Sequence, residues 1–194
     1  MEDLKSNRKY SAILDVSRRL FWKHGVRRVT IDEICREAQT SKMTFYRFFA
    51  NKTELAKVVI DRYYEESLKK FREILRADTS PAEKMQGIIS MKLEGSNDIS
   101  NEFIQDVLTL NNPELYSFFS EKLRVISDEG IREFKNGQEE GWIRKDLNVE
   151  FMFFFFLKTA AFLADPELLG KFSSPKEMIL EMSNLLIYGI VPRD

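Results

Sequence analysis

Residues 13–55 read ILDVSRRLFWKHGVRRVTIDEICREAQTSKMTFYRFFANKTEL. The first part of this stretch has one apolar face at helical spacing, formed by Ile13, Val16, Leu20 and Phe21. A second such face follows, formed by Ile31, Ile34, Cys35 and Ala38. The short turn Gln39-Thr40 then leads to Ser41, a residue type that caps helices, at the start of a third segment. Two short helices joined by a tight turn and packed on a longer first helix form the plan of a helix-turn-helix.

The composition of the whole chain agrees with a helical globular protein. Of 194 residues, 43% are apolar and 31% are charged, which is typical of globular rather than disordered chains. One Cys and one His exclude a disulfide framework and a zinc site built from several such ligands. No secretory signal is visible at the start, and the most apolar run, residues 151–157, is far too short to span a bilayer. We therefore expect a soluble, cytoplasmic, all-α protein without a membrane partner.

Charge is distributed unevenly along the chain. Residues 1–52 carry 12 Lys and Arg against 6 Asp and Glu, whereas the rest carries 18 against 25. A basic first quarter joined to an acidic remainder favours one part that meets a polyanion and one that does not. Scatter of charge over a solvated surface is the alternative interpretation.

Capping signals divide the chain into helices. A Ser, Thr or Asn is followed three residues later by Glu at residues 30, 51, 80 and 174, and a proline follows the cap at 80, 112 and 174. These signals predict helices over 8–24, 30–38, 41–48, 51–76, 80–95, 98–110, 112–139, 147–164 and 174–190. The helix over 51–76 runs from the basic part into the acidic part. It is expected to join a domain of residues 1–52 to a domain of residues 53–194.

The stretch quoted above resembles the N-terminal DNA-binding domain of TetR-family transcriptional regulators. The resemblance lies in an apolar helix ending in Phe21 and Gly25, a helix capped by Thr30, the segment Ser41 through Phe49, and Lys52 with Leu55. It runs without a gap, but two positions depart from the family pattern. Gln39 and Met43 stand where the family usually has Gly. Gln39 is compatible with a left-handed turn, whereas Met43 changes the surface offered to DNA.

A recognition helix turns its N-terminal half to the major groove, so that half should be polar and its back apolar. Phe45, Phe48 and Phe49 suit the apolar back. Helix starts add backbone N–H groups that attract phosphate, and the family resemblance implies a phosphate contact for the Tyr46 hydroxyl. The predicted DNA-binding residues are Arg28, Thr30, Ser41, Lys42, Thr44, Tyr46, Arg47 and Lys52, with Lys42 and Arg47 directed at base edges. Arg18, Arg19 and Lys23 are interpreted as solvated, and Cys35 as a core thiol rather than a redox sensor.

The rest of the chain resembles the family only in outline. The resemblance implies that the last two helices of two protomers pack into a four-helix bundle, so a homodimer is expected, with Phe154, Met178, Met182 and Leu186 in the interface. A two-fold dimer suits a palindromic operator in double-stranded DNA. The alternative is that the Phe-rich helix serves only the core of one protomer.

The resemblance also implies a ligand pocket among the helices after residue 76. The candidate lining residues are Met85, Ile88, Met91, Phe103, Leu108, Tyr116, Phe119 and Trp142, which favour a small apolar ligand. Each of them could equally be plain core. No cofactor, metal or catalytic residues are predicted.

The sequence favours one of three classes of function. A dimeric regulator, most simply a repressor released from its operator by a small apolar ligand, accounts for the most residues. An enzyme has little support, because the single His and the absence of a Gly-rich phosphate loop leave no catalytic constellation. A helical ligand-binding or interaction protein without DNA binding is the remaining alternative, and retarded migration of duplex DNA would separate it from the first.

Overall fold

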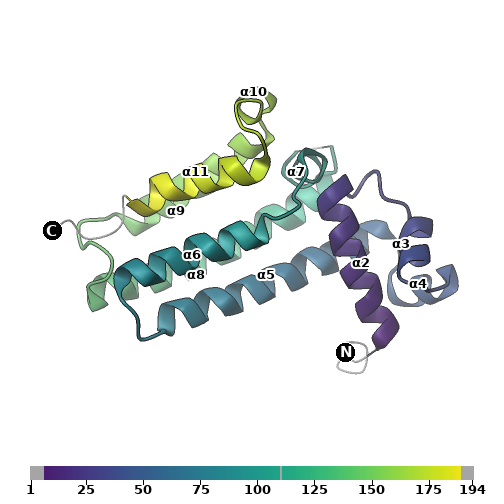
Figure 1. The fold of residues 1–194 in the computed structure, drawn as a ribbon, viewed down its shortest axis with the longest axis horizontal. Helices are drawn as coiled ribbons and strands as arrows, with labels where there is room; N and C mark the ends of the chain where they lie inside the picture. Colours follow the sequence, from purple (N-terminus) through teal and green to yellow (C-terminus); the bar gives the residue numbers. More distant parts are fainter. Residues whose placement is uncertain (1–6, 110, 189–194) are drawn as a thin grey trace. The chain divides into compact units, whose positions relative to one another are not determined.

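A computed structural model describes residues 7–109 and 111–188, apart from the side chains of residues 159–161 and 186–188. Within these residues all regular structure is helical, with no strand. The helices, shown in Figure 1, are α2 (Arg8–His24), α3 (Ile31–Glu37), α4 (Lys42–Phe48), α5 (Lys52–Arg76), α6 (Pro81–Gly95), α7 (Asn101–Leu108), α8 (Pro113–Glu140), α9 (Val149–Thr159), the 3-10 helix η1 (Ala160–Ala164), α10 (Pro166–Leu169) and α11 (Pro175–Tyr188). The prediction of an all-α fold that begins with a helix-turn-helix is confirmed.

The helices form two compact units, and each contains segments from two parts of the chain. The first comprises residues up to Tyr64 together with Asp98–Phe119, and the second comprises Glu65–Asn97 together with the residues from Ser120 onward. The predicted division of the chain into a domain of residues 1–52 and a domain of residues 53–194 stays a prediction. By packing, the start of α5 belongs with α2–α4, because Leu55, Ala56 and Ile60 are buried in their core.

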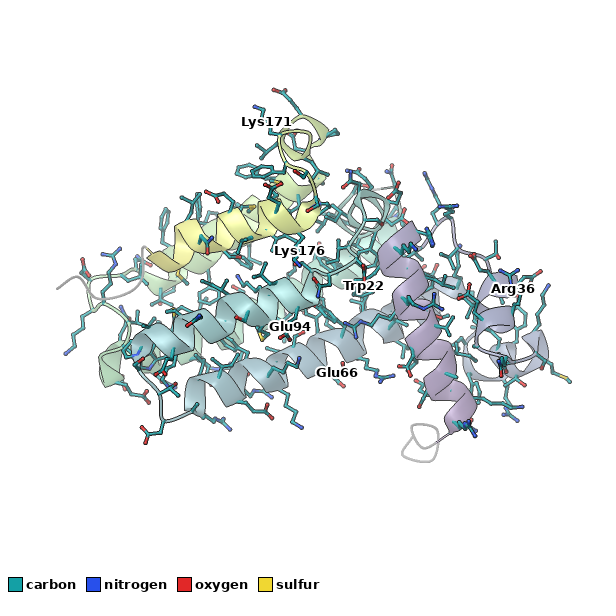
Figure 2. All side chains as sticks on the ribbon, in the orientation of Figure 1. Trp22, Arg36, Glu66, Glu94, Lys171 and Lys176 are labelled. Atoms are coloured by element: carbon teal, nitrogen blue, oxygen red, sulfur yellow. The ribbon has the colours of Figure 1, made fainter. Side chains whose placement is uncertain are left out.

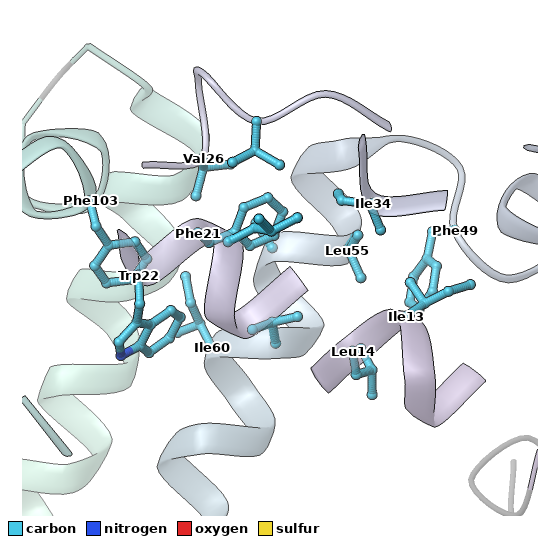
Figure 3. Close-up of a cluster of buried hydrophobic side chains, with 14 of the residues drawn as sticks. Ile13, Leu14, Phe21, Trp22, Val26, Ile34, Phe49, Leu55, Ile60 and Phe103 are labelled. Carbon is cyan, nitrogen blue, oxygen red and sulfur yellow. The ribbon is translucent and has the colours of Figure 1, made fainter. Parts of the chain in front are cut away.

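The first unit is built on an apolar core that α2, α3 and α4 share with the start of α5 and with α7. Ile13, Phe21 and Ile34 are fully buried there, and Figure 3 shows them beside Leu55 and Ile60. Trp22 of α2 lies against Phe103 of α7, with ring centroids 4.3 Å apart. Burial of aromatic rings supplies much of the apolar area that stabilises a small domain, so α7 is an integral part of the first unit.

The second unit has a separate core. Its buried members are Leu75, Met85, Ile88, Phe134, Trp142, Ile143 and Val149. Helix α11 packs along α6, and Figure 1 shows the two running side by side. Phe153 of α9 meets Phe134 of α8 edge-on at 5.3 Å between centroids. Because α5 supplies Ile60 to the first core and Leu75 to the second, the prediction of one helix shared by two helical parts is confirmed.

The predicted caps are in place. The Ser80 hydroxyl accepts from the N–H of Glu83 while the Glu83 carboxylate accepts from the N–H of Ser80, which is a complete capping box. Thr30, Asn51, Asn112 and Ser174 each accept a backbone N–H three residues later. These bonds satisfy amides that a helix leaves unpaired at its start, so capping fixes most of the observed boundaries.

Two predicted helix boundaries differ from the structure by three residues or more, and a third cannot be compared with it. The helix expected over 98–110 begins at Asn101, because Asp98 has a φ of 63° and Ser100 is the residue that caps it. The helix expected over 147–164 ends as a 3-10 turn, and α10 begins at Pro166 after Asp165, whose carboxylate accepts the N–H of Glu167. The predicted end of the last helix at residue 190 lies outside the described residues.

Candidate nucleic-acid interface

Helix α4 is held to the first unit by its aromatic side. Phe45 and Phe49 are 0% and 4% exposed, and Phe48 packs against the same core. Tyr10 of α2 stacks on Phe49 at 5.3 Å between ring centroids. Gln39, in the turn before α4, has a φ of 49°, as expected for a residue that stands in place of Gly. The apolar back predicted for a recognition helix is therefore present.

The opposite side of α4 is exposed and polar. Ser41 caps the helix, and its hydroxyl lies 3.0 Å from the Thr44 hydroxyl. Lys42 is exposed, and its ammonium is 2.6 Å from the Asp32 carboxylate, which raises the pKa of Lys42. Ser41, Lys42 and Thr44 thus lie close together at the start of α4, the first two exposed and Thr44 half-buried.

Two longer side chains complete this surface. Tyr46 is 55% exposed, so its hydroxyl is free to reach beyond the helix. The Arg47 guanidinium lies over the Phe48 ring at 4.9 Å from the centroid. Stacking on a ring leaves the edge of the guanidinium available for a bidentate contact. The charges and hydroxyls of α4 match what the major groove and its flanking phosphates require.

A second group of predicted residues lies where α3 begins. Thr30 caps α3 through the N–H of Glu33 at 3.2 Å and is exposed. Arg28 is exposed as well, and its guanidinium lies 3.3 Å from Nδ1 of His24. Arg36, on the far end of α3, projects away from the helix in Figure 2. The loop and the first turn of α3 thus present both charge and a helix start for phosphate.

Lys52 has partners that its sequence position does not reveal. Its ammonium donates to the backbone carbonyls of Arg27 at 2.9 Å and Val29 at 2.5 Å. Burial lowers the pKa of this lysine. Two of its three N–H donors are therefore committed within the protein, and the predicted phosphate contact of Lys52 stays a prediction.

Two residues outside the predicted set belong to this part of the molecule. Met43 is 82% exposed on α4, although sequence reasoning noted it only as a departure from the family pattern. Asp106 is 6% exposed on the apolar face of α7, and its carboxylate accepts the N–H of Arg27. The sequence could have indicated Asp106. It lies on the same helical face as the apolar Phe103 and Val107, and a carboxylate on a buried face needs a hydrogen-bond partner.

The predicted ligand residues are divided between the two cores. Met85, Ile88 and Trp142 belong to the core of the second unit, whereas Phe103, Leu108 and Phe119 belong to that of the first. Met91 is half-buried and Tyr116 is 37% exposed. A cavity of about 710 Å³ in the second unit has Trp142 in its wall, but none of the other predicted ligand residues. The set stays a prediction, with Met85, Ile88 and Trp142 as the part that the structure brings together.

The predicted dimer residues also differ in their surroundings. Phe154 is 57% exposed, and Phe151, Phe155 and Phe162 are exposed to a similar degree. Met182 is half-buried, Met178 is 1% exposed within its own unit, and the side chain of Leu186 lies outside the described residues. Phe153 of the Phe-rich helix packs against the core of its own unit, at Phe134. The role of this helix toward a partner stays a prediction.

Comparison with known families identifies the N-terminal segment. Residues 13–59 match the family described as bacterial regulatory proteins, tetR family. The transcriptional repressor KstR2 of Mycobacterium tuberculosis is 20% identical over 156 residues, which cover 79% of this chain and 78% of KstR2. The transcriptional regulator UidR of Escherichia coli is 25% identical over 138 residues, which cover 70% and 69% of the two chains.

Solved structures extend the likeness beyond the N-terminal segment. The fatty acid degradation regulator FadR from Bacillus halodurans superposes with a TM-score of 0.72 at 18% identity, over 95% of this chain and 97% of that one. At such identity the likeness concerns the fold alone. It extends the shared architecture to both units of the chain.

Proposed function

The chain belongs to the TetR family of transcriptional regulators, and from this premise we propose that it is a cytoplasmic repressor that binds a palindromic operator as a homodimer and leaves it when a small apolar ligand binds. It is a DNA-binding regulator and not an enzyme, because both the matched family and its similar proteins are regulators. None of the described helices is long and apolar enough to cross a membrane.

The observation that carries the proposal is the two-sided character of α4. Its buried side is aromatic, and its exposed side holds Ser41, Lys42 and Arg47. A helix of this kind lies in the major groove with its N-terminal residues against base edges. Arg28, in the loop before α3, supplies a positive charge, and Thr30 supplies a hydroxyl, both of which suit contacts with phosphate on the flanking backbone.

Support for a homodimer comes from the outer face of the Phe-rich helix. Phe151, Phe154 and Phe155 are 64%, 57% and 47% exposed on α9. A monomeric protein seldom leaves several neighbouring aromatic side chains in water, and such a patch is typical of an interface. A two-fold pair of protomers would offer two recognition helices to the two halves of a palindrome.

An apolar ligand is supported by the core of the second unit and by the similar proteins. Met85, Ile88 and Trp142 meet there, and methionine with aromatic side chains forms adaptable apolar sites. KstR2 is described as a ketosteroid regulator and FadR as a fatty acid degradation regulator, names that refer to largely apolar compounds. Helix α5 runs from one unit into the other and is the proposed lever between ligand and DNA.

The proposal is tested by replacing Arg47. We expect Arg47→Ala to cost about 1–3 kcal/mol on a duplex that the wild-type protein has selected from a random pool, and to relax the preference at one base position. Arg124→Ala, which removes the same charge from the exposed surface of α8, is the matched control and should leave binding unchanged. An equal loss on selected and random DNA would contradict base reading by Arg47.

A further inference from the structure

The loop between α2 and α3, residues 25–29, is packed closely on α7. Gly25 has a φ of 78°, and a Cβ atom there would lie 2.8 Å from Oδ2 of Asp106 and 3.0 Å from Cβ of Glu102. Val26 and Val29 are 2% and 0% exposed. The backbone of the loop therefore has little freedom to move relative to α7.

Two charged side chains hold the loop from different helices. The N–H of Arg27 donates to Oδ2 of Asp106 at 2.9 Å, and the carbonyl of Arg27 accepts from the Lys52 ammonium at 2.9 Å. The same ammonium donates to the carbonyl of Val29. We call this arrangement of Asp106, Lys52 and the Arg27 backbone the loop clamp.

The loop clamp is electrostatically strong. Asp106 is 6% exposed, so its carboxylate binds the Arg27 amide in a medium of low polarity, where a charge-assisted hydrogen bond is stronger than in water. Burial lowers the pKa of Lys52, and the nearby Asp106 carboxylate raises it. The Asp106 carboxylate thus favours the charged form of the half-buried Lys52, and removal of Asp106 takes away part of the compensation for the burial of that ammonium.

Two of the predicted DNA-binding residues lie in this loop or directly after it. Arg28 is exposed within it, and Thr30 directly after it caps α3. Contacts to phosphate fix the register of a protein on the duplex, and an interface that is already ordered loses less entropy on binding. By holding the loop in one position, Asp106 and Lys52 would thus favour DNA binding by Arg28 and Thr30.

We propose that Asp106 is a positioning residue for DNA binding: through the loop clamp it fixes Arg28 and Thr30 for their predicted phosphate contacts, without touching DNA itself. The inference rests on DNA binding through α3 and α4. It assigns a role in DNA affinity to α7, which contributes none of the predicted DNA contacts.

Electrostatics alone predicts the opposite effect for this residue. Removal of a negative charge from a DNA-binding unit should strengthen its attraction to a polyanion. If Asp106 acts through the loop clamp, the same removal should weaken binding. The sign of the change therefore separates the two explanations.

The experiment compares Asp106→Ala, Asp106→Asn and Glu102→Gln on a duplex selected from a random pool by the wild-type protein. We expect Asp106→Ala to bind about tenfold more weakly, with the salt dependence of affinity unchanged because no phosphate contact is lost. Asp106→Asn should recover most of the affinity, since its amide oxygen still accepts the Arg27 N–H. Glu102→Gln removes an exposed charge one turn away and should bind as tightly as wild type or more tightly.

Affinity of Asp106→Ala equal to or above that of wild type, in protein that is folded by circular dichroism at the assay temperature, would overturn the proposal. Wild-type binding in the same assay shows that DNA recognition is intact, so this result would count against the loop clamp alone.

Amide hydrogen exchange provides a measurement that needs no variant. The Arg27 amide of the wild-type protein should exchange at least about tenfold more slowly than in an unstructured peptide, and exchange at the unstructured rate would also overturn the proposal.

Discussion

At the scale of single residues, the contacts of Lys52 with the loop before α3 give it a second role in DNA binding to test against the predicted phosphate contact. Its ammonium lies on the carbonyls of Arg27 and Val29. We expect Lys52→Met to weaken binding to every duplex alike, because the loop that it holds carries no base contacts. The logarithmic slope of affinity against salt should stay unchanged, whereas loss of a phosphate contact would make it shallower by about 0.9 for each protomer. Measurement of that slope for both proteins decides between the two roles.

Lys92 on α6 gives a prediction about pH. Its ammonium lies over the Phe156 ring at 4.6 Å from the centroid, and burial lowers its pKa from 10.5 to about 8. The folded protein therefore releases this proton before the unfolded chain does, so the free energy of unfolding should rise as pH increases from about 8 toward 10.5. Below pH 8 the ammonium of Lys92 is charged and buried, which lowers the free energy of unfolding. We expect Lys92→Met to raise the free energy of unfolding at pH 7 by about 1–2 kcal/mol.

Denaturant unfolding of wild type and Lys92→Met between pH 7 and 10 checks this prediction. Lys145→Met replaces an exposed lysine of the same unit and should leave both the stability and its pH dependence as they are. A stability of Lys92→Met that rises with pH as steeply as that of wild type would show that another group titrates.

At the scale of helices, most of the fold could be predicted because the signals are local. Capping residues and apolar spacing predict the starts of α3, α6 and α8 to within one residue. The end of α9 could not be predicted in this way. A helix end is recognised where the helical spacing of apolar residues stops, and the four consecutive Phe residues 153–156 show no such spacing. The Asp165-Pro166 cap that starts α10 is visible in the sequence, and its use as a helix start was missed.

The candidate site was predictable to a similar extent and for the same reason. The exposure of the residues on α4 and at the start of α3 follows from their position on their own helix, which the local sequence predicts. The partners of Lys52 and Asp106 are backbone groups of a loop that lies 25 and 79 residues away in the chain. Contacts of that kind depend on how helices pack, and no local pattern encodes them.

Two glycines within helices provide a test of packing in the second unit. A Cβ atom at Gly130 of α8 would lie 2.4 Å from the rigid ring of Phe153, whereas at Gly87 of α6 the nearest atom is the Ile74 methyl at 3.0 Å. Alanine favours a helix over glycine by about 1 kcal/mol. We expect Gly87→Ala to be neutral or stabilising and Gly130→Ala to destabilise by about 1–3 kcal/mol. Equal free energies of unfolding for the two variants would contradict the packing of α9 on α8.

At the scale of the whole molecule, α9 offers two neighbouring phenylalanines with different surroundings. Phe154 is 57% exposed, whereas Phe153 meets Phe134 in the core. Glutamate at an apolar interface carries an unpaired charge that association would bury. We therefore expect Phe154→Glu to be a folded monomer and Phe153→Glu to be unstable. Sedimentation velocity at micromolar concentration checks both, and a wild-type monomer or a Phe154→Glu dimer would contradict an interface on this face.

Selection of DNA from a random pool shows whether two copies of α4 read one duplex. We expect the wild-type protein to enrich a sequence with two half-sites related by a two-fold axis. With three or four phosphate contacts for each protomer, the logarithm of its affinity should fall against the logarithm of salt with a slope of about −5 to −7. Enrichment of no sequence, together with equal affinity for every duplex in the pool, would contradict the reading of one duplex by two copies of α4.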